Sequence, residues 1–225
     1  SFCYVQIMEI NMFFIKLLNK KDIDFCLKGI KEVSYVDGAK TQPVNKFYKI
    51  KQNLQTTHVP EEVRKYLIDL FYRHSYIDSV YCPNRISVNF YNKYQKGDYY
   101  NLHVDAFKAM PKSNNVFFDY GFSVNLTDDY EGGEFFLQTD VGPVSFKLAA
   151  GEAVIFPIIY PHGVNKVTSG VRENILGWMS SNVSYEQAFI LKSLYDVNAY
   201  LKDKDKDKFV QSTLVQTYLK KAWGK

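Results

Sequence analysis

The chain has 225 residues, of which 46% are hydrophobic, and this suffices for one domain with a sizeable core. Its formal net charge is +4, and its 28 basic and 24 acidic residues are interspersed, which excludes the concentrated basic stripe of a nucleic-acid-binding protein. The three cysteines, Cys3, Cys26 and Cys82, have neither paired nor metal-ligand spacing, so we expect packing roles and a reducing, cytoplasmic location.

The apolar residues at the start of the chain raise the question of a signal peptide. No basic region precedes them, Glu9 interrupts the run and no small-residue cleavage site follows. We therefore expect a first strand near 12–18. No segment predicts a transmembrane span, so no membrane partner is expected.

Two helices are expected in the remainder of the N-terminal part. Asp22 is the expected cap of a helix over about 22–33, where apolar side chains recur at helical spacing. The segment 36–38 has the composition of a turn, and the polar stretch after it predicts no regular structure. A second helix is better supported, because Pro60 suits its first turn and an apolar face continues to about His74.

After Pro83 the hydrophobic period changes from helical to two, which predicts strands. The expected strands are 86–94, 99–105, 116–126, 134–138, 144–148, 153–159 and 172–180. We expect a loop at 110–115 and turns at 95–98, 127–133, 142–143, 149–151 and 168–170. Many short strands separated by glycine turns favour a closed or double-sheet β core.

The C-terminal part returns to a helical pattern from about Tyr185, and again from about Phe209 to Trp223. Between these stretches the charges alternate over 201–208, which we interpret as a solvated helix face or loop in preference to an interaction tail. The apolar spacing of the two helices fits either packing on the β core or pairing of two subunits in a homodimer.

We therefore expect an α+β chain whose core is a double-stranded β-helix, or jelly roll, with N-terminal helices packed on it. The main domain is predicted to span 1–183, with a helical part at 1–85 and the jelly-roll core at 86–183. A C-terminal helical extension is predicted over 184–225.

His103 and Asp105 have the spacing of two ligands on one face of a strand. Successive side chains of a strand point to opposite faces, so residues i and i+2 project together while Val104 points away. A second imidazole from a distant strand, His162, would complete a set of two histidines and one carboxylate. That set is the facial triad of iron(II) oxygenases, which leaves positions open for a co-substrate and dioxygen.

Arg172 follows His162 after the expected turn at 168–170. An arginine on the returning strand can reach back toward the metal and hold a carboxylate through two parallel hydrogen bonds. A dicarboxylic acid that chelates a metal at one end needs such an anchor at its other end. Together with the triad, Arg172 predicts an oxygenase that uses iron(II) and 2-oxoglutarate.

Other interpretations of the same residues stay open. Taken alone, a His-x-Asp pair on a strand is usually a surface or hydrogen-bonded pair, His162 suits a buried core position, and Arg172 suits a solvated strand end. A zinc hydrolase could use the same three ligands, although it gives no reason for Arg172. A non-catalytic protein built on the same barrel is a further alternative. A nucleobase demethylase is disfavoured because basic and aromatic residues do not cluster.

Further segments carry a family resemblance, namely Tyr94-Gln95, 100–105, 129–134 (Asp-Tyr-Glu-Gly-Gly-Glu), 147–152 (Lys-Leu-Ala-Ala-Gly-Glu), 161–172 and Trp178. Over nearly its whole length the chain resembles the PKHD-type hydroxylases, bacterial relatives of the prolyl 4-hydroxylases among the 2-oxoglutarate- and iron(II)-dependent oxygenases. The resemblance implies iron(II) held by His103, Asp105 and His162, 2-oxoglutarate anchored by Arg172, dioxygen as the second co-substrate, and L-ascorbate as a reductant.

Two features depart from the family pattern. Tyr94 resembles the tyrosine that assists co-substrate binding in the wider prolyl hydroxylase group, but its spacing to the first ligand differs there. Glu173 and Asn174 stand where relatives carry small or apolar residues, and Asn174 faces the cavity together with Arg172. A halogenase is disfavoured because halogenating relatives lack the carboxylate that Asp105 supplies. Kinship favours peptidyl proline as the substrate, and free amino acids or other small molecules stay open.

Overall fold

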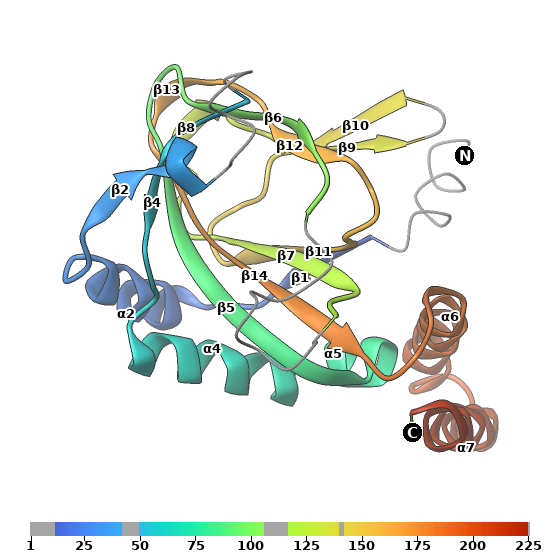
Figure 1. Cartoon of the computed structure of the whole chain (residues 1–225). Coiled ribbons are helices and arrows are strands. Elements are labelled where there is room, and N and C mark those ends of the chain that lie inside the picture. Colours follow the sequence, from blue (N-terminus) through green and yellow to red (C-terminus); the bar gives the residue numbers. More distant parts are fainter. Residues whose placement is uncertain (1–11, 42–49, 106–116, 140–141, 225) are drawn as a thin grey trace.

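Two antiparallel sheets face each other and form the body of the protein (Figure 1). In this computed structural model the described residues are 12–41, 50–105, 117–139 and 142–224. The loop expected at 110–115 and Cys3 lie outside them.

Both sheets mix strands from distant parts of the chain. The larger sheet has the order β1 (Phe13–Lys16), β11 (Glu152–Pro157), β7 (Tyr120–Asn125), β14 (Arg172–Ser181), β5 (Pro83–Tyr94), β4 (Leu54–Thr56) and β2 (Tyr35–Asp37). The smaller has the order β10 (Gly142–Phe146), β9 (Phe135–Thr139), β12 (His162–Val164), β6 (Tyr99–His103) and β3 (Lys51–Gln52). A separate pair joins β13 (Val167–Gly170) to β8 (Tyr130–Gly132). The predicted jelly-roll core is therefore confirmed.

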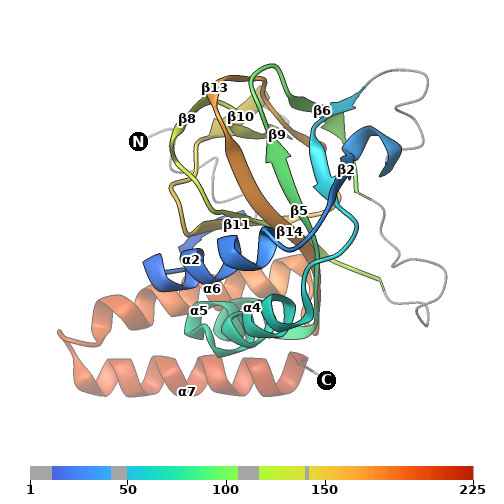
Figure 2. The same cartoon turned by 90° about the vertical axis from the view of Figure 1, so that its left-hand side faces the viewer.

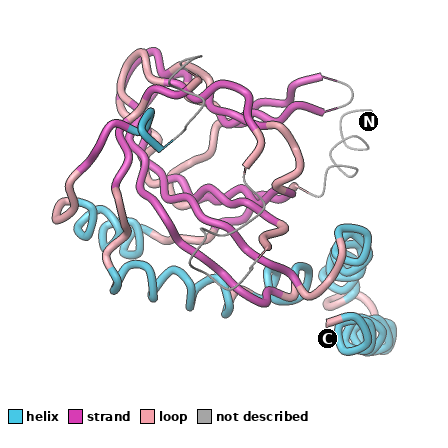
Figure 3. Tube along the Cα trace, in the orientation of Figure 1, coloured by secondary structure: helices cyan, strands magenta, loops and turns pink. Residues whose placement is uncertain are grey.

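The helices gather on one side of the larger sheet, and Figures 2 and 3 show this separation of helices from strands. They are α2 (Lys20–Ile30), α4 (Glu61–Arg73), α5 (Ser75–Tyr81), α6 (Tyr185–Leu201) and α7 (Lys206–Trp223). A short 3₁₀ turn, η1 (Gly38–Thr41), lies apart from them, next to β2 and β4. Among the described residues, no helix is both long and apolar enough to cross a membrane.

The main hydrophobic core lies between the larger sheet and these helices. Val63, Leu67 and Phe71 follow one another at four-residue spacing on α4 and are fully buried, and the Phe71 ring lies 4.4 Å from that of Phe122 on β7. A second apolar cluster, with Phe135 of β9, lies between the two sheets. This second cluster fills only part of the space between the sheets and leaves room for a cavity.

The first helix begins earlier than predicted, because Asn19 and not Asp22 is its N-cap. The Asn19 Oδ1 accepts hydrogen bonds from the backbone N–H groups of Lys21 and Asp22, at 2.8 and 3.2 Å. Asp22 forms the other half of a capping box, since its Oδ2 accepts from the backbone N–H of Asn19 at 2.8 Å. The predicted N-cap therefore lies three residues C-terminal to the observed one.

Four predicted turns are wrong in part, because the segments pair with neighbouring strands. The segment 36–38 lies mostly in β2, which pairs with β4, and 168–170 lies in β13, which pairs with β8 from the expected turn at 127–133. Gly142 and Pro143 belong to β10. Glycine and proline predict turns from local preference, but the partner strands satisfy the backbone hydrogen bonds of these segments and hold them extended.

The C-terminal helices pack on the rest of the protein. Ala188 and Leu191 of α6 are buried in the main core, and Lys220 of α7 donates a 2.7 Å hydrogen bond to Asp78 of α5. The helices are joined to each other by Asn198, whose Nδ2 donates to Gln216 Oε1 at 2.7 Å. The apolar residues Ala188 and Leu191 of α6 are therefore explained by packing within the chain.

Candidate functional site

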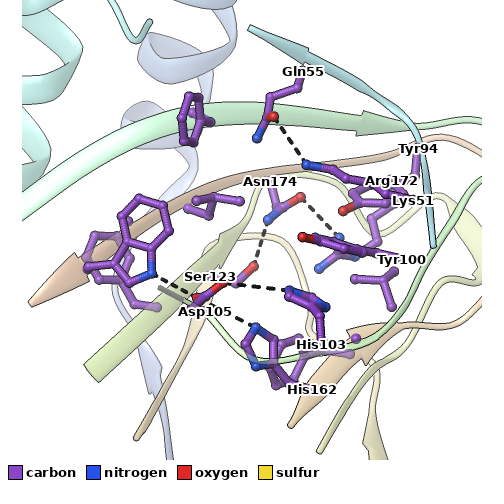
Figure 4. A pocket seen from close by; sticks show the side chains of 18 of the residues that line it. Lys51, Gln55, Tyr94, Tyr100, His103, Asp105, Ser123, His162, Arg172 and Asn174 are labelled. Atoms are coloured by element: carbon purple, nitrogen blue, oxygen red, sulfur yellow. Dashed lines mark hydrogen bonds and ion pairs between the residues drawn. The ribbon is translucent and has the colours of Figure 1, made fainter. Parts of the chain in front are cut away.

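A cavity of about 710 Å³ lies between the two sheets (Figure 4). The larger sheet contributes side chains from β5, β7 and β14, and the smaller sheet contributes side chains from β3, β6 and β12. Its polar lining consists of Lys40, Lys51, Gln55, Thr56, Thr57, Tyr94, Tyr100, His103, Asp105, Ser123, His162, Arg172, Asn174 and Trp178. Its apolar lining includes Phe135, Phe156, Val164 and Leu176. Every residue that the sequence singled out as a site residue lines this one space.

His103, Asp105 and His162 meet at one end of the cavity. His103 ends β6, Asp105 lies two residues further along the chain, and His162 begins β12, directly opposite His103 in the antiparallel register. Each histidine Nε2 lies 3.7 Å from a different oxygen of the Asp105 carboxylate. The ligand atoms of the three residues all lie within 4.8 Å of one another, close enough to share one metal ion.

The two imidazoles present their Nε2 lone pairs toward Asp105. The Nδ1 of His103 lies 2.9 Å from the carbonyl oxygen of Asn101, and that of His162 lies 3.0 Å from the carbonyl oxygen of Tyr160. A carbonyl oxygen only accepts, so each Nδ1 carries a hydrogen, and in the neutral form of each imidazole the lone pair is on Nε2. Burial and the neighbouring His162 lower the pKa of His103 to about 4, so this imidazole is neutral at pH 7. The donor set therefore suits a divalent metal ion.

The Asp105 carboxylate is held by a side chain from the opposite sheet. The indole Nε1 of Trp178, on β14, donates a 2.8 Å hydrogen bond to Asp105 Oδ2. Two further aromatic rings, those of Phe118 and Phe90, each lie 6.2 Å from the Trp178 ring. Sequence reasoning singled out Trp178 as one of the positions that carry the family resemblance but did not find its bond to Asp105.

Arg172 is a buried cation, with 2% of its surface exposed. Its Nη1 donates to the Oδ1 of Asn174 at 3.1 Å, and its guanidinium lies 5.3 Å from the ring centre of Tyr94, its register partner on β5. Within the described residues no carboxylate lies within ion-pair distance of the guanidinium. Burial of an unpaired charge is costly, so the position suits the carboxylate of a ligand.

The side chains next to Arg172 are fixed in orientation by hydrogen bonds. Because a guanidinium only donates, the Oδ1 of Asn174 faces Arg172 and its Nδ2 donates to the Oγ of Ser123 on β7 at 2.8 Å. Gly133 gives the arginine room, since a Cβ built there would lie 3.3 Å from Arg172 Cδ and 2.9 Å from Val167. Burial raises the pKa of Tyr94 to about 12 despite the opposing charge of Arg172, so its phenol is protonated at pH 7.

Lys51 is a second buried cation in the cavity, and sequence reasoning missed it because the stretch around β3 showed no periodic pattern. The side chain is 5% exposed, and its Nζ donates to Gln55 Oε1 at 3.2 Å. It also lies 4.7 Å from the ring centre of Tyr100, its register partner on β6. Burial lowers the pKa of Lys51 to about 8. Lys51 is therefore mostly charged at pH 7.

Comparison with known proteins points to one family. The family model described as the 2OG-Fe(II) oxygenase superfamily matches residues 86–180. A PKHD-type hydroxylase of Idiomarina loihiensis is 31% identical over 156 residues, which cover 68% of this chain and 69% of the relative.

Two solved structures share the fold at low sequence identity. A prolyl hydroxylase from Trichoplax adhaerens, in complex with a peptide fragment of the hypoxia inducible factor oxygen degradation domain, matches with a TM-score of 0.58 and 16% identity over 83% of this chain and 89% of its own. HygX from Streptomyces hygroscopicus, with nickel, 2-oxoglutarate and hygromycin B bound, matches with a TM-score of 0.56 and 11% identity over 81% and 88%.

Proposed function

Because the chain belongs to the PKHD-type hydroxylases of the 2OG-Fe(II) oxygenase superfamily, it is a hydroxylase dependent on iron(II) and 2-oxoglutarate, and we propose that His103, Asp105 and His162 hold the iron. The observation that supports this assignment best is the convergence of two Nε2 lone pairs on one carboxylate, at 3.7 Å each. Iron(II) is bound by such a set with positions left open for co-substrates.

Arg172 is proposed to bind the carboxylate of 2-oxoglutarate farther from the metal. The unpaired guanidinium and the apolar surroundings support this role, since a carboxylate would supply the missing counter-charge through two hydrogen bonds. Asn174 holds the guanidinium from one side. Tyr94 is proposed as a further co-substrate residue through the contact of its ring with Arg172.

Iron and 2-oxoglutarate, when bound, supply the oxidising chemistry that couples decarboxylation of 2-oxoglutarate to succinate with hydroxylation of the substrate. The chain prepares the ligands, because the backbone carbonyl oxygens of Asn101 and Tyr160 hold the Nδ1 atoms of His103 and His162 and so orient each ring. Trp178 limits rotation of the Asp105 carboxylate. Apolar side chains such as Phe156 and Leu176 exclude water from the cavity wall.

The substrate is proposed to be a peptidyl prolyl residue or a small molecule. The two structural neighbours hold a peptide in one case and hygromycin B in the other, so the fold accepts both kinds. We further propose L-ascorbate as the reductant and the cytoplasm as the compartment, where the free, buried thiols of Cys26 and Cys82 would stay reduced.

A zinc hydrolase with the same ligands is the second candidate, and the cavity lining argues against it. Such an enzyme needs a carboxylate or similar base beside the metal-bound water. Among the described residues that line the cavity, the one carboxylate is that of Asp105, which is itself a ligand. Within the described part of the lining, a zinc hydrolase would therefore have no carboxylate left to act as its base.

The test combines His103→Ala and Asp105→Ala in one variant and measures iron(II) binding by anaerobic titration and succinate release from 2-oxoglutarate. We expect both to be lost, because removal of two of three ligands leaves one weak donor. His58→Ala, at an exposed histidine outside the cavity, is the matched control and keeps both. Retention of iron binding and turnover in the double variant contradicts the assignment, as does turnover with zinc in place of iron.

A further inference from the structure

The helix α7 exposes apolar side chains on the face that points away from the rest of the protein. Its buried residue is a glutamine, Gln216, which donates to the backbone carbonyl of Leu191 at 3.1 Å and accepts from Asn198 at 2.7 Å. Its exposed large side chains are apolar and keep 46–70% of their surface exposed; they are Val210, Leu214, Val215 and Tyr218. A surface helix usually buries its apolar face, so this pattern indicates that another surface covers the outward face of α7.

The position of α7 leaves this face accessible along the whole helix. In Figure 2, α7 runs along the lower edge of the molecule, farther from the two sheets than α6 and α5. Its inward side is fixed to the protein, because Leu219 and Trp223 pack against the main core and Lys220 donates to Asp78 of α5. The 18 residues of α7 make a helix about 27 Å long. The outward face is therefore a rigid strip of that length.

Five residues on this face are spaced symmetrically about Leu214. They are Asp207, Val210, Leu214, Tyr218 and Lys221, which follow one another in steps of 3, 4, 4 and 3 residues. At 100° per residue their side chains fall within roughly 80° of the helix circumference, and all five are exposed. The apolar positions are therefore the same from either end of the strip, whereas the charges at its two ends are opposite.

We propose that α7 binds α7 of a second copy of this chain, antiparallel, about a two-fold axis at Leu214. Leu214 then meets its own counterpart, and Val210 of each copy meets Tyr218 of the other. Asp207 of each copy meets Lys221 of the other, so both ends of the contact join opposite charges. A parallel pairing would instead place like charges together at both ends. The charges therefore select the antiparallel orientation.

The two end charges are available for such pairs. Within the described residues neither Asp207 nor Lys221 belongs to an ion pair, whereas their neighbours Asp205, Lys208 and Lys220 do. The antiparallel arrangement also brings the positive N-terminal end of each helix beside the negative C-terminal end of the other. The outward face is thus complementary to itself both in shape period and in charge.

Sedimentation velocity of the full chain tests the proposal. Two paired helices bury less than the roughly 1,200 Å² of a stable complex, so we expect a dimer with a Kd of about 10 µM. The mean mass should therefore rise from monomer to dimer between about 1 and 300 µM protein. A chain that stays monomeric throughout overturns the proposal, and binding of that monomer to anionic lipid vesicles would assign the face to a membrane instead.

Leu214→Asp places two like charges in contact at the two-fold axis. We expect it to weaken the dimer at least about 100-fold, which makes the protein monomeric over the whole range. Ile159→Asp, at an exposed apolar residue between β11 and β12, is the matched control and should keep the dimer. An unchanged Kd in Leu214→Asp, or an equal loss in Ile159→Asp, overturns the proposal.

A charge exchange tests the orientation of the two helices. Asp207→Lys and Lys221→Glu each turn both end pairs into like-charge pairs, and each should weaken the dimer about tenfold. The double variant forms both pairs again with the signs exchanged, so most of the affinity should return. The two residues lie about 21 Å apart on one helix, so only a contact between chains can produce this recovery. Losses that add in the double variant overturn the antiparallel pairing.

Circular dichroism reports whether each variant keeps its helices. Where a charge reversal does not, Asp207→Asn and Lys221→Gln replace it, and each should weaken the dimer about threefold. In that pair of substitutions the loss in the double variant should be no larger than in either single variant, because each one already removes both ion pairs. A double variant that loses the product of the two single effects overturns the proposal.

Discussion

Trp178 and Asp105 are joined by a 2.8 Å hydrogen bond that spans the cavity from one sheet to the other. The indole donates to Oδ2 of the carboxylate, while Oδ1 faces the Nε2 of His103 at 3.7 Å. Partners of this kind fix the orientation of a metal ligand and raise its affinity for the ion. The bond therefore couples the closing strand of the larger sheet to the metal site on the smaller one.

Trp178→Phe is expected to weaken iron(II) binding by about 10- to 100-fold, the usual effect of losing a hydrogen bond to a metal ligand. The substitution keeps an aromatic ring near Phe90 and Phe118 and removes the hydrogen-bond donor. Anaerobic titration with iron(II) measures the affinity. The chain offers a matched control in its other tryptophan, Trp223 of α7, since Trp223→Phe leaves the cavity untouched. Unchanged affinity in Trp178→Phe would show that the carboxylate is oriented without the indole.

Asn174→Ala is expected to raise the KM for 2-oxoglutarate about tenfold, because it removes the side-chain acceptor that orients Arg172. Asn174→Asp should raise it more, although it is nearly isosteric, because a carboxylate beside the guanidinium would compete with that of 2-oxoglutarate. Succinate release at varied 2-oxoglutarate gives both values. Asn84→Ala, at an exposed position of β5, is the control. A KM in Asn174→Asp at or below that of Asn174→Ala contradicts this account of Arg172.

The candidate metal ligands and the candidate co-substrate anchor could be identified from the sequence alone. His103 and Asp105 are detectable from the strand period, and Arg172 from its place on the strand after His162. The long β stretches and α4 were also predictable, since each has several apolar residues at regular spacing. The roles of these three residues, and a domain boundary between residues 183 and 184, stay predictions.

The contacts that complete the site depend on register between strands far apart in the chain, which local patterns do not contain. Lys51 faces Tyr100 because β3 pairs with β6, and β3 is only two residues long. Trp178 reaches Asp105 because the two sheets face each other. The turns at 36–38 and 168–170 were mispredicted for the same reason, since pairing with β4 and β8 outweighs local preference.

Lys51 should make the stability of the metal-free protein depend on alkaline pH. Burial lowers the pKa of Lys51 from 10.5 to about 8, so between these values the unfolded chain binds the proton and the native chain does not. The free energy of unfolding therefore rises with pH across this window, by up to about 3 kcal/mol. Urea unfolding is measured at pH 7, 8.5 and 10 for the unsubstituted protein and for Lys51→Met, so that the effects of other titrating groups cancel in the difference. The unsubstituted protein should gain stability relative to the variant as the pH rises. A constant difference between the two would contradict the burial of a charged Lys51.

Gly133→Ala and Gly97→Ala form a pair that separates backbone strain from an effect on Arg172. Both glycines have a positive φ, +66° and +94°, so alanine at either should cost about 1–2 kcal/mol of stability. Only at Gly133 would the new methyl group press on Arg172 Cδ, at 3.3 Å, whereas nothing lies within 4 Å of a Cβ at Gly97.

We expect both variants to lose stability in thermal unfolding, and Gly133→Ala to lose more, because its methyl group would also lie 2.9 Å from Val167. A rise of about tenfold in the Kd for 2-oxoglutarate is expected in Gly133→Ala alone, since displacement of the guanidinium weakens a bidentate contact. Isothermal titration with Mn(II)-loaded protein measures this constant. Equal 2-oxoglutarate affinity in the two variants would mean either that Arg172 tolerates the methyl group or that it does not hold the co-substrate. Arg172→Met decides between these, because its 2-oxoglutarate affinity falls only if Arg172 is the anchor.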